Sequence, residues 1–231
     1  MIGIITYDNP HRKTQDLIYS LLINGFKDIF LIITPWKNRK NFIPRFQHRP
    51  IKSINVSVDE MCLNLGLKSI RVNVDELENL FLEKQFKNII IAGAGILPEN
   101  IAKKFKVINS HPGYLPYSKG LDALKWSIYN VDPIGVTTHY ISEKADEGLL
   151  IEKKIIPLYK EDSFYNLCLR VYESEIEMLV NSIKLIEKDL APLISLADND
   201  FIANRRMSNE KELIMIEKFK KRRDKMKSKY I

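Results

Sequence analysis

Residues 2–35 read IGIITYDNPHRKTQDLIYSLLINGFKDIFLIITP, and this stretch sets the expected fold. Its two short apolar runs, 2–6 and 29–33, have the length of buried strands. Between them apolar residues recur at helical spacing from Leu17 to Leu22, and Asn24-Gly25 is a typical helix end. A strand–helix–strand unit of this kind predicts a parallel sheet with helices on both faces.

The rest of the chain continues the same alternation. We expect further strands at 69–74, 89–92, 106–109, 134–141 and 149–156, and helices at 58–65, 75–86, 98–104, 120–130 and 163–188. The helical pattern loosens after Asp189, so we place a domain boundary near 190. Beyond it, a last helix is expected around 209–227, with Met215, Phe219 and Met226 on its apolar face.

Composition excludes several classes of protein. The 231 residues are 45% hydrophobic and 28% charged, which is enough for a sizeable core and argues against disorder. No apolar run approaches the roughly 18 residues that span a bilayer, so we expect no membrane partner. Cys62 and Cys168 are too few for a disulfide framework or a zinc site. We expect both thiols to be small buried hydrophobes in the reducing cytoplasm, with no metal bound.

The net charge of +7 is unevenly distributed. Residues 205–231 hold 11 Lys/Arg and 4 Asp/Glu and account for the whole excess, so residues 1–204 are neutral. An enzyme of nucleic acid usually carries its basic charge as a patch on the folded surface. We therefore expect no nucleic-acid partner, although a basic tail can still touch a polyanion.

Two loops are notable. Residues 34–52 mix aromatic and proline residues with many Lys and Arg, and loops of this length are often functional, although a solvated surface excursion fits equally. Gly93-Ala94-Gly95 follows the most apolar strand but lacks the third glycine of a dinucleotide site. It indicates a tight turn where backbone approaches backbone or a ligand.

The residues best suited to chemistry lie at 107–116, VINSHPGYLP. Asn109 and His111 are two apart and share one side of an extended segment, which Pro112 ends. An amide beside an imidazole suits stabilisation of an oxyanion and movement of a proton. Asp146 precedes Gly148 in a loop between two strands and can reach back to orient His111. Caps and turns are an equally good explanation of these residues from spacing alone.

A larger set of motifs resembles one family. The motifs are Asn109-x-His111-Pro112, Leu115-Pro116, Lys119-Gly120, Gly135-Val136-Thr137-Thr138-His139, Asp146-x-Gly148 and Pro157. In order and spacing they are similar to those of the formyltransferases that use N10-formyltetrahydrofolate. The resemblance implies a Rossmann-like formyltransferase fold, with a catalytic domain over 1–190 and a basic, partly helical extension over 191–231.

The resemblance also implies roles for individual residues. A neutral amine attacks the formyl carbon, Asn109 and His111 stabilise the oxyanion, and Asp146 orients His111 or a water that relays protons. The family's pterin pocket and its further histidine match these positions: Ile96, Leu97, His139, Ser142 and Ala145. The chain departs from the family at Gly113-Tyr114, where Ser-Leu is common, and in a shorter segment at Ala94-Gly95.

The acceptor amine is inferred from other parts of the chain than the reaction. About 40 residues follow the boundary, too few for the C-terminal barrel of the methionyl-tRNA enzyme, and the first strand lacks the phosphate loop of the glycinamide ribonucleotide enzyme. The phrase 41–50, NFIPRFQHRP, resembles bacterial sugar N-formyltransferases of O-antigen and lipopolysaccharide synthesis. We therefore expect a nucleotide-linked amino sugar, first dTDP-4-amino-4,6-dideoxyglucose and next a GDP-linked sugar.

A nucleotide diphosphate requires cationic or amide donors, and Arg gives bidentate contacts. The candidates are Arg45, His48, Arg49, Tyr114, Lys119, Arg205 and Arg206. Exposed surface charge explains each of the basic ones equally well.

Three other functions stay open: a formyltetrahydrofolate hydrolase, a formyltransferase with another amine acceptor including tRNA, and a binding module without catalysis. The apolar face of the last helix fits a homodimer or packing onto the chain's own body.

Overall fold

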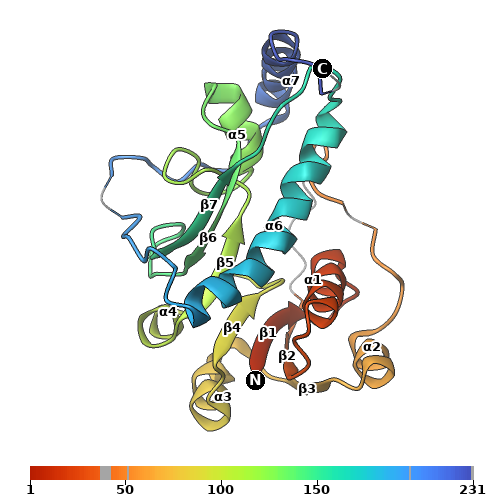
Figure 1. The fold of residues 1–231 in the computed structure, drawn as a ribbon, viewed down its shortest axis with the longest axis vertical. Helices are drawn as coiled ribbons and strands as arrows, with labels where there is room; N and C mark the ends of the chain where they lie inside the picture. The colour runs from red at the N-terminus through yellow and green to blue at the C-terminus, as the bar shows by residue number, and fades with distance from the viewer. Residues whose placement is uncertain (37–42, 51, 198, 230–231) are drawn as a thin grey trace.

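The computed structural model describes residues 1–36, 43–50, 52–197 and 199–229. Its centre is one seven-stranded sheet in the order β3-β2-β1-β4-β5-β6-β7 (Figure 1). The strands are β1 (Ile2–Tyr7), β2 (Ile29–Thr34), β3 (Lys68–Arg71), β4 (Asn88–Ile91), β5 (Val107–His111), β6 (Gly135–Tyr140) and β7 (Leu150–Ile155). The first five pair in parallel, whereas β6 and β7 are antiparallel to their neighbours.

Helices cover both faces, as expected. The helices are α1 (Arg12–Ile23), α2 (Val58–Leu65), α3 (Leu77–Lys84), α4 (Glu99–Lys104), α5 (Ala123–Asn130), α6 (Phe164–Glu187) and α7 (Asn209–Arg223), with a 3-10 turn at Val74–Glu76. On β1, Ile4 packs in a core with α1, α2 and α6, whereas Ile5 packs against α3 and α4 on the opposite face. This alternation along one strand is the period of two that buries both faces of a parallel sheet. Figure 1 shows α6 crossing the first of these faces diagonally.

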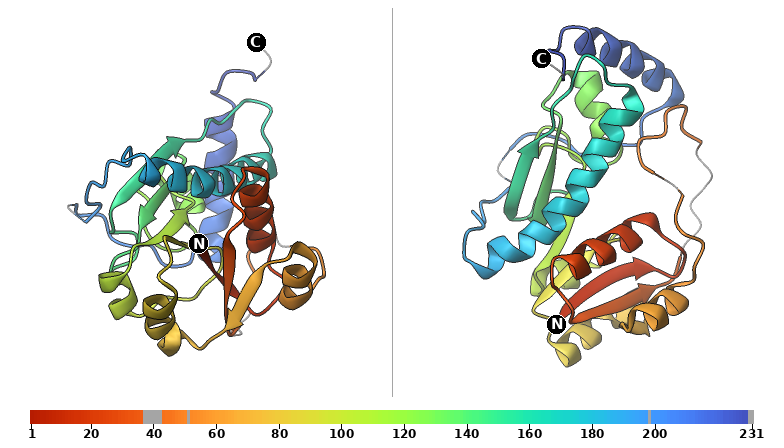
Figure 2. Two further views of the ribbon diagram at one scale, coloured as in Figure 1. Left: turned by 60° about the horizontal axis from the view of Figure 1, so that its bottom comes forward. Right: turned by 45° about the vertical axis from the view of Figure 1, so that its right-hand side comes forward.

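A third core joins the C-terminal residues to the rest. Met215 and Phe219 of α7 are buried in one cluster with Leu124 of α5 and Leu167 of α6. Figure 2 shows α7 lying beside α5 beyond the end of the sheet. The apolar face of α7 is therefore covered by the chain itself, the second of the two expectations for it, whereas Met226 lies beyond the helix. The domain boundary at 190 and the homodimer stay predictions.

Most expected elements are confirmed, and three boundaries differ for local reasons. The third strand ends at Arg71, because the backbone N–H of Asn73 donates to Glu76 and starts a 3-10 turn. The helix expected over 120–130 starts at Ala123, since Gly120 and Asp122 have positive φ. The last helix ends at Arg223 and not at 227.

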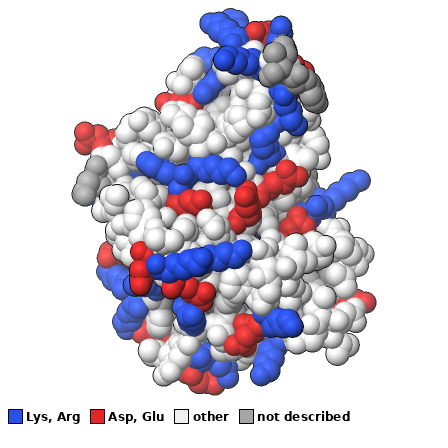
Figure 3. Space-filling model, viewed as in Figure 1, with Lys and Arg blue, Asp and Glu red and all other residues white. Residues whose placement is uncertain are grey.

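The charge distribution agrees with the sequence. Figure 3 shows Lys and Arg gathered over the α7 end of the molecule, whereas both signs are interspersed elsewhere on that face. Both thiols are buried, as expected, and burial raises the pKa of Cys168 to about 12. The expected basic loop can be compared only at 34–36, 43–50 and 52, since 37–42 and 51 lie outside the described residues.

Candidate active site

The proposed catalytic residues meet at the carboxyl end of β5. Asn109 and His111 come from this strand, which pairs with β6 so that Asn109 lies opposite His139. Asp146 lies in the loop between β6 and β7, and its Oδ1 is 3.3 Å from Nδ1 of His111. The strand order places β5 beside the antiparallel part of the sheet. The loop after β6 can therefore reach back over the end of β5.

Both ring nitrogens of His111 face hydrogen-bond acceptors. Nε2 lies 2.6 Å from the carbonyl oxygen of Ser118, which can only accept, so Nε2 carries a hydrogen. Nδ1 faces the carboxylate of Asp146, another acceptor. The ring is nearly buried, with 6% of the side chain exposed. The arrangement holds His111 as a hydrogen-bond donor.

His139 orients Asn109. Its Nδ1 is 2.9 Å from the carbonyl oxygen of Tyr140, so Nδ1 carries the hydrogen and Nε2 is an acceptor. Nε2 lies 3.4 Å from Nδ2 of Asn109, which therefore directs one amide hydrogen at the ring and keeps a second for another partner. Burial lowers the pKa of His139, in agreement with the neutral ring. Asn109 and His111 thus present N–H groups from the same strand end.

The loop that carries Asp146 is held in a specific conformation. Asp146 has φ of 61°, and its Oδ2 accepts a 2.8 Å hydrogen bond from the backbone N–H of Gly120. Two residues later, a Cβ on Gly148 would lie 1.6 Å from the carbonyl oxygen of Tyr140. Only glycine therefore permits this close approach of the loop to β6.

Gly113 makes the imidazole contact possible. A Cβ there would lie 2.8 Å from Nε2 of His111 and 2.8 Å from the carbonyl oxygen of Ser118. Gly113, where the resembled family often has Ser, thus lies against the imidazole of His111. This departure from the family pattern lets the 113–118 loop close onto the imidazole.

The residues proposed for the pterin pocket lie on two loops near this strand end. Leu97 packs against the core on the α3/α4 face together with Ala94 and Ile141, whereas Ile96 is 98% exposed. An exposed isoleucine beside a partly buried apolar surface suits contact with a flat ring. Ser142 donates to the carbonyl oxygen of Lys144 within its own loop, and Ala145 is exposed.

The residues proposed for the acceptor fall into three groups. His48 and Arg49 form the first group. The pKa of His48 is lowered to about 3 by burial and, in the same direction, by the nearby charges of Arg49, Lys125 and Arg206. Among the described residues, Nδ1 of His48 is buried without a hydrogen-bond partner.

The second group takes part in holding the loops. Lys119 is fully buried, and its Nζ donates to Glu147 at 2.9 Å. Tyr114 is half-buried under Nζ of Lys153, 4.7 Å from the ring centroid. These contacts place both side chains in the framework of the 113–120 loop.

The third group, Arg45 and Arg205, lies near α5 and the C-terminal helix α7. The backbone N–H of Arg45 donates to Glu212 of α7 at 2.7 Å, and the carbonyl oxygen of Arg205 accepts from Trp126. The backbone of both residues is therefore anchored to the α5/α7 region while their side chains are exposed.

Sequence reasoning missed a buried ionic network behind the site. Nζ of Lys13 donates to Ser110 at 2.7 Å and lies 3.2 Å from Glu175 of α6, which is 1% exposed. Burial opposes ionisation of Glu175, but Arg49 and Lys13 outweigh it and hold the pKa of this carboxyl below its ordinary value. Since Ser110 lies between Asn109 and His111, the network fixes the middle of the catalytic strand. A charged residue on the apolar stripe of α6 was the available signal.

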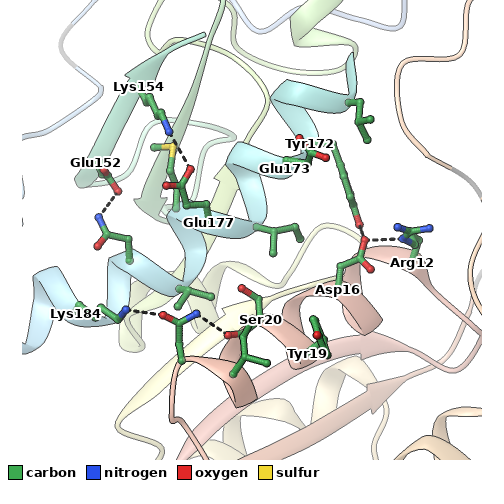
Figure 4. A pocket seen from close by; sticks show the side chains of 17 residues that line it. Arg12, Asp16, Tyr19, Ser20, Glu152, Lys154, Tyr172, Glu173, Glu177 and Lys184 are labelled. Atoms are coloured by element: carbon green, nitrogen blue, oxygen red, sulfur yellow. Dashed lines mark hydrogen bonds and ion pairs between the residues drawn. The ribbon is translucent and has the colours of Figure 1, made fainter. Parts of the chain in front are cut away.

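A cavity of about 740 Å³ lies elsewhere, between α1, α6 and β7 (Figure 4). Its charged and polar groups largely pair with one another: Arg12 with Asp16, Lys154 with Glu177, Lys184 with Asn24. Such a surface is already satisfied without a ligand.

Two searches of the described residues are negative. They contain no group of three or more His, Cys, Asp or Glu side chains that could hold a metal ion. No helix in the same residues is both long and apolar enough to cross a membrane.

Comparison with known sequences places this arrangement among formyl transferases. The sequence pattern of one family, described as Formyl transferase, matches residues 40–183. A methionyl-tRNA formyltransferase of Thermodesulfovibrio yellowstonii is 26% identical over 81% of this chain and 60% of its own length. The trifunctional purine biosynthetic protein adenosine-3 of Chironomus tentans is 29% identical over 48% of this chain. The chain thus spans 60% and 8% of these two relatives.

Solved structures share the fold. A sugar N-formyltransferase from Shewanella sp FDAARGOS_354 has a TM-score of 0.60 at 19% identity, covering 95% of this chain and 87% of that one. A 4-N formyltransferase from Francisella tularensis gives 0.62 at 18%, covering 94% and 86%. A phosphoribosylglycinamide formyltransferase from Anaplasma phagocytophilum gives 0.61 at 20%, covering 81% and 86%.

Proposed function

Since residues 40–183 match its pattern, the chain belongs to the formyl transferase family, and we propose that it formylates the amine of a nucleotide-linked amino sugar with N10-formyltetrahydrofolate as donor. The observation that carries the chemistry is the meeting of Asn109, His111 and Asp146 at one strand end. The dTDP-linked 4-amino-4,6-dideoxyglucose is the first acceptor to test, and a role in O-antigen synthesis in the cytoplasm would follow from it.

The proposed reaction exchanges one bond for another. The lone pair of the amine nitrogen attacks the formyl carbon, a carbon–nitrogen bond forms, and the formyl oxygen becomes an oxyanion. The bond from this carbon to N10 then breaks, and the proton lost by the amine is transferred to N10. Amide formation and tetrahydrofolate release balance without an oxidant or a metal ion.

Two N–H donors suit the oxyanion. Asn109 has one amide hydrogen not directed at His139, and Nε2 of His111 carries a hydrogen that Ser118 accepts in this structure. The Nε2 hydrogen has to turn from Ser118 toward the oxyanion or be shared between them. Prearranged donors of this kind stabilise the charge that develops in the transition state.

Asp146 has a positioning and electrostatic part in this scheme. Its carboxylate faces Nδ1 of His111 at 3.3 Å, which orients the ring, and is itself held by the backbone N–H of Gly120. Binding both substrates next to this triad would supply a further part of the acceleration. The translational and rotational entropy is then lost on binding and not in the chemical step.

The preference for a sugar acceptor rests on charge and on fold coverage. The charges of Arg49 and Arg206 both act on His48, and such a group of cations suits a diphosphate. The sugar N-formyltransferase structures match 94–95% of this chain, whereas the phosphoribosylglycinamide enzyme matches 81%. The methionyl-tRNA enzymes among the sequence relatives make tRNA an acceptor that the experiment has to include.

A mass-spectrometric endpoint assay tests the proposal. The protein is incubated with N10-formyltetrahydrofolate and, in separate reactions, dTDP- and GDP-linked amino sugars, glycinamide ribonucleotide and methionyl-tRNA. We expect one added formyl group on one of the sugars and none with His111→Ala. Formylation of glycinamide ribonucleotide or methionyl-tRNA alone would refute the sugar acceptor. Formate release without any amine would identify a hydrolase.

A further inference from the structure

A second cavity, of about 310 Å³, is lined by Gln47, Arg49, Pro50 and Lys52, the start of α1 and the first two turns of α6. Its charged lining residues among those described are Arg12, Arg49 and Lys52, and its aromatic one is Tyr165. It is smaller than the α1/α6/β7 cavity, yet its volume is within the range of small-molecule sites.

The charge of this cavity has one sign. The lining residues described include three cations and no carboxylate. The carboxylates that do contact these cations lie beside the cavity: Asp16 is 2.6 Å from Nε of Arg12, and the buried Glu175 is 3.6 Å from Arg49. These contacts orient the two guanidinium groups but occupy only part of their five N–H donors, so each can still donate to a ligand. A dianion such as a diphosphate is the ligand that such a lining favours.

The positive field extends beyond the lining. His11, which precedes α1, has its pKa lowered to about 4 by burial and then by the charges of Lys13 and Arg49. At neutral pH this imidazole is uncharged, and its lowered pKa reports the positive potential next to the cavity. The backbone N–H groups of the first turn of α1 add partial positive charge at the same place.

The rest of the cavity suits a flat ring. Tyr165, on the first turn of α6, is 63% exposed. Exposure of an aromatic ring to water is unfavourable, so covering it with a ligand would contribute to binding. Cys168, Leu169 and Pro50 supply apolar lining next to it. Nucleobases stack on exposed aromatic rings, and an adjacent cation strengthens the contact.

The cavity adjoins the catalytic strand through short contacts. Arg49 is 3.6 Å from Oε1 of Glu175, and that oxygen is 3.2 Å from Oγ of Ser110. Ser110 is the residue before His111. The cavity is therefore connected, through Arg49 and Glu175, to the residue of β5 that precedes His111.

We propose that this cavity binds the nucleoside diphosphate part of the acceptor, with the diphosphate on Arg12, Arg49 and Lys52 and the base on Tyr165, while the sugar amine extends to His111. The inference rests on the proposed function, since it places a nucleotide-linked substrate. It adds Arg12, Lys52 and Tyr165, which the motifs did not indicate, to Arg49.

Isothermal titration calorimetry with dTDP, UDP, GDP and inorganic pyrophosphate tests the site without any turnover. We expect one nucleotide to bind more tightly than pyrophosphate. Lys52→Ala should weaken nucleotide and pyrophosphate binding alike, by about tenfold, because it removes one charged hydrogen bond. Tyr165→Ala should weaken nucleotide binding by about fivefold or more and leave pyrophosphate unchanged, since it removes stacking alone.

Lys184→Ala is the matched control, because this cation lines the larger α1/α6/β7 cavity and not the basic one. It should leave nucleotide affinity unchanged. Loss of affinity in Lys184→Ala but not in Lys52→Ala would place the nucleotide in the larger cavity and overturn the inference. Equal affinity for pyrophosphate and every nucleotide would overturn the assignment of the base to Tyr165.

The formylation assay separates this inference from the proposed function. Formylation of a sugar nucleotide with KM unchanged in Lys52→Ala and Tyr165→Ala would refute the cavity alone. Nucleotide binding that depends on Lys52 and Tyr165, without formylation of any sugar, would support the cavity and refute the acceptor.

Discussion

The backbone N–H of Gly120 donates a 2.8 Å hydrogen bond to Oδ2 of Asp146. The other oxygen of the same carboxylate faces His111 at 3.3 Å and His139 at 3.7 Å. One carboxylate thus connects the loop after β5 with both imidazoles of the strand pair. Its negative charge acts on the two rings, whereas its hydrogen bond to Gly120 fixes the loop.

Asp146→Asn separates these two tasks. Asparagine tolerates the positive φ at this position and retains an oxygen for the Gly120 hydrogen bond, so we expect a melting temperature close to that of the wild type. The negative charge beside Nδ1 of His111 is lost, and kcat should fall by about 10²-fold or more. Thermal unfolding and initial rates on the same preparations check both. A kcat within threefold of the wild type would remove the charge of Asp146 from the mechanism.

Asn109→Ala removes one of the two proposed oxyanion donors. We expect kcat to fall by roughly 10²–10³-fold, the usual effect of losing one such donor. Binding of N10-formyltetrahydrofolate should persist, because the proposed pterin contacts lie on other loops. Fluorescence titration of the folate together with initial rates gives both quantities. Unchanged turnover would exclude Asn109 from the chemistry, and lost folate binding would assign it to the donor site.

The fold and the triad could be predicted from the sequence because their signals are local. Apolar runs of strand length alternate with helical spacing along the first 35 residues, and this alternation determines a parallel sheet. The candidate site was predicted from the order of the motifs, since Asn109, His111 and Asp146 match the pattern of the resembled family. In the structure the loop that carries Asp146 lies against the end of β5.

Contacts between distant segments could not be predicted. The Lys13–Glu175 pair joins residues 162 positions apart, and the Lys125–Glu212 pair joins residues 87 apart. A single sequence does not indicate with which distant residue a charged side chain will pair. The hydrogen bond from His111 to Ser118 is another case, because its acceptor is a backbone carbonyl that any residue provides.

Gly113→Ala tests whether the close contact at His111 matters for activity. The added Cβ would lie 2.8 Å from both Nε2 of His111 and the carbonyl oxygen of Ser118, so one of them has to shift. Because small misplacements at a reaction centre are costly, we expect kcat to fall by about tenfold or more. Steady-state kinetics and circular dichroism measure the effect on the folded enzyme. An unchanged kcat would show that the His111–Ser118 contact is dispensable.

Lys125→Met should destabilise the C-terminal part of the structure. Lys125 of α5 and Glu212 of α7 are fully buried and ion-paired, and Glu212 also accepts the backbone N–H groups of Arg45 and Phe46. Loss of the lysine leaves an unpaired buried carboxylate, so the free energy of unfolding should fall by about 3–5 kcal/mol.

The double variant Lys125→Met/Glu212→Leu is the control for that prediction. It removes both charges, so much of the stability should return, although the two backbone N–H groups then lack their acceptor. Urea unfolding of the single and double variants gives the coupling. Additive losses would show that the two side chains do not stabilise each other.

The lowered pKa values of His48 and His11 should make the free energy of unfolding depend on pH. Burial, then Arg49 and other cations, lowers its pKa to about 3 from 6.5, and burial lowers that of His11 to about 4. Between these values and 6.5 the unfolded chain binds protons that the folded chain does not, so stability is fully present above 6.5 and is lost as the pH falls. We expect the free energy of unfolding to fall between pH 7 and pH 5 by about 2 kcal/mol from His48 and by a similar amount from His11.

His48→Gln removes one of these two titrations. Because glutamine does not bind a proton in either state, the decrease in unfolding free energy from pH 7 to pH 5 should be about 2 kcal/mol smaller than in the wild type. Urea unfolding at both pH values gives the four free energies needed. His11→Gln is the matched variant, and its decrease should be reduced as well. Equal decreases in the wild type and His48→Gln would mean that His48 titrates alike in the folded and unfolded chains, contrary to the buried, cation-flanked position found here.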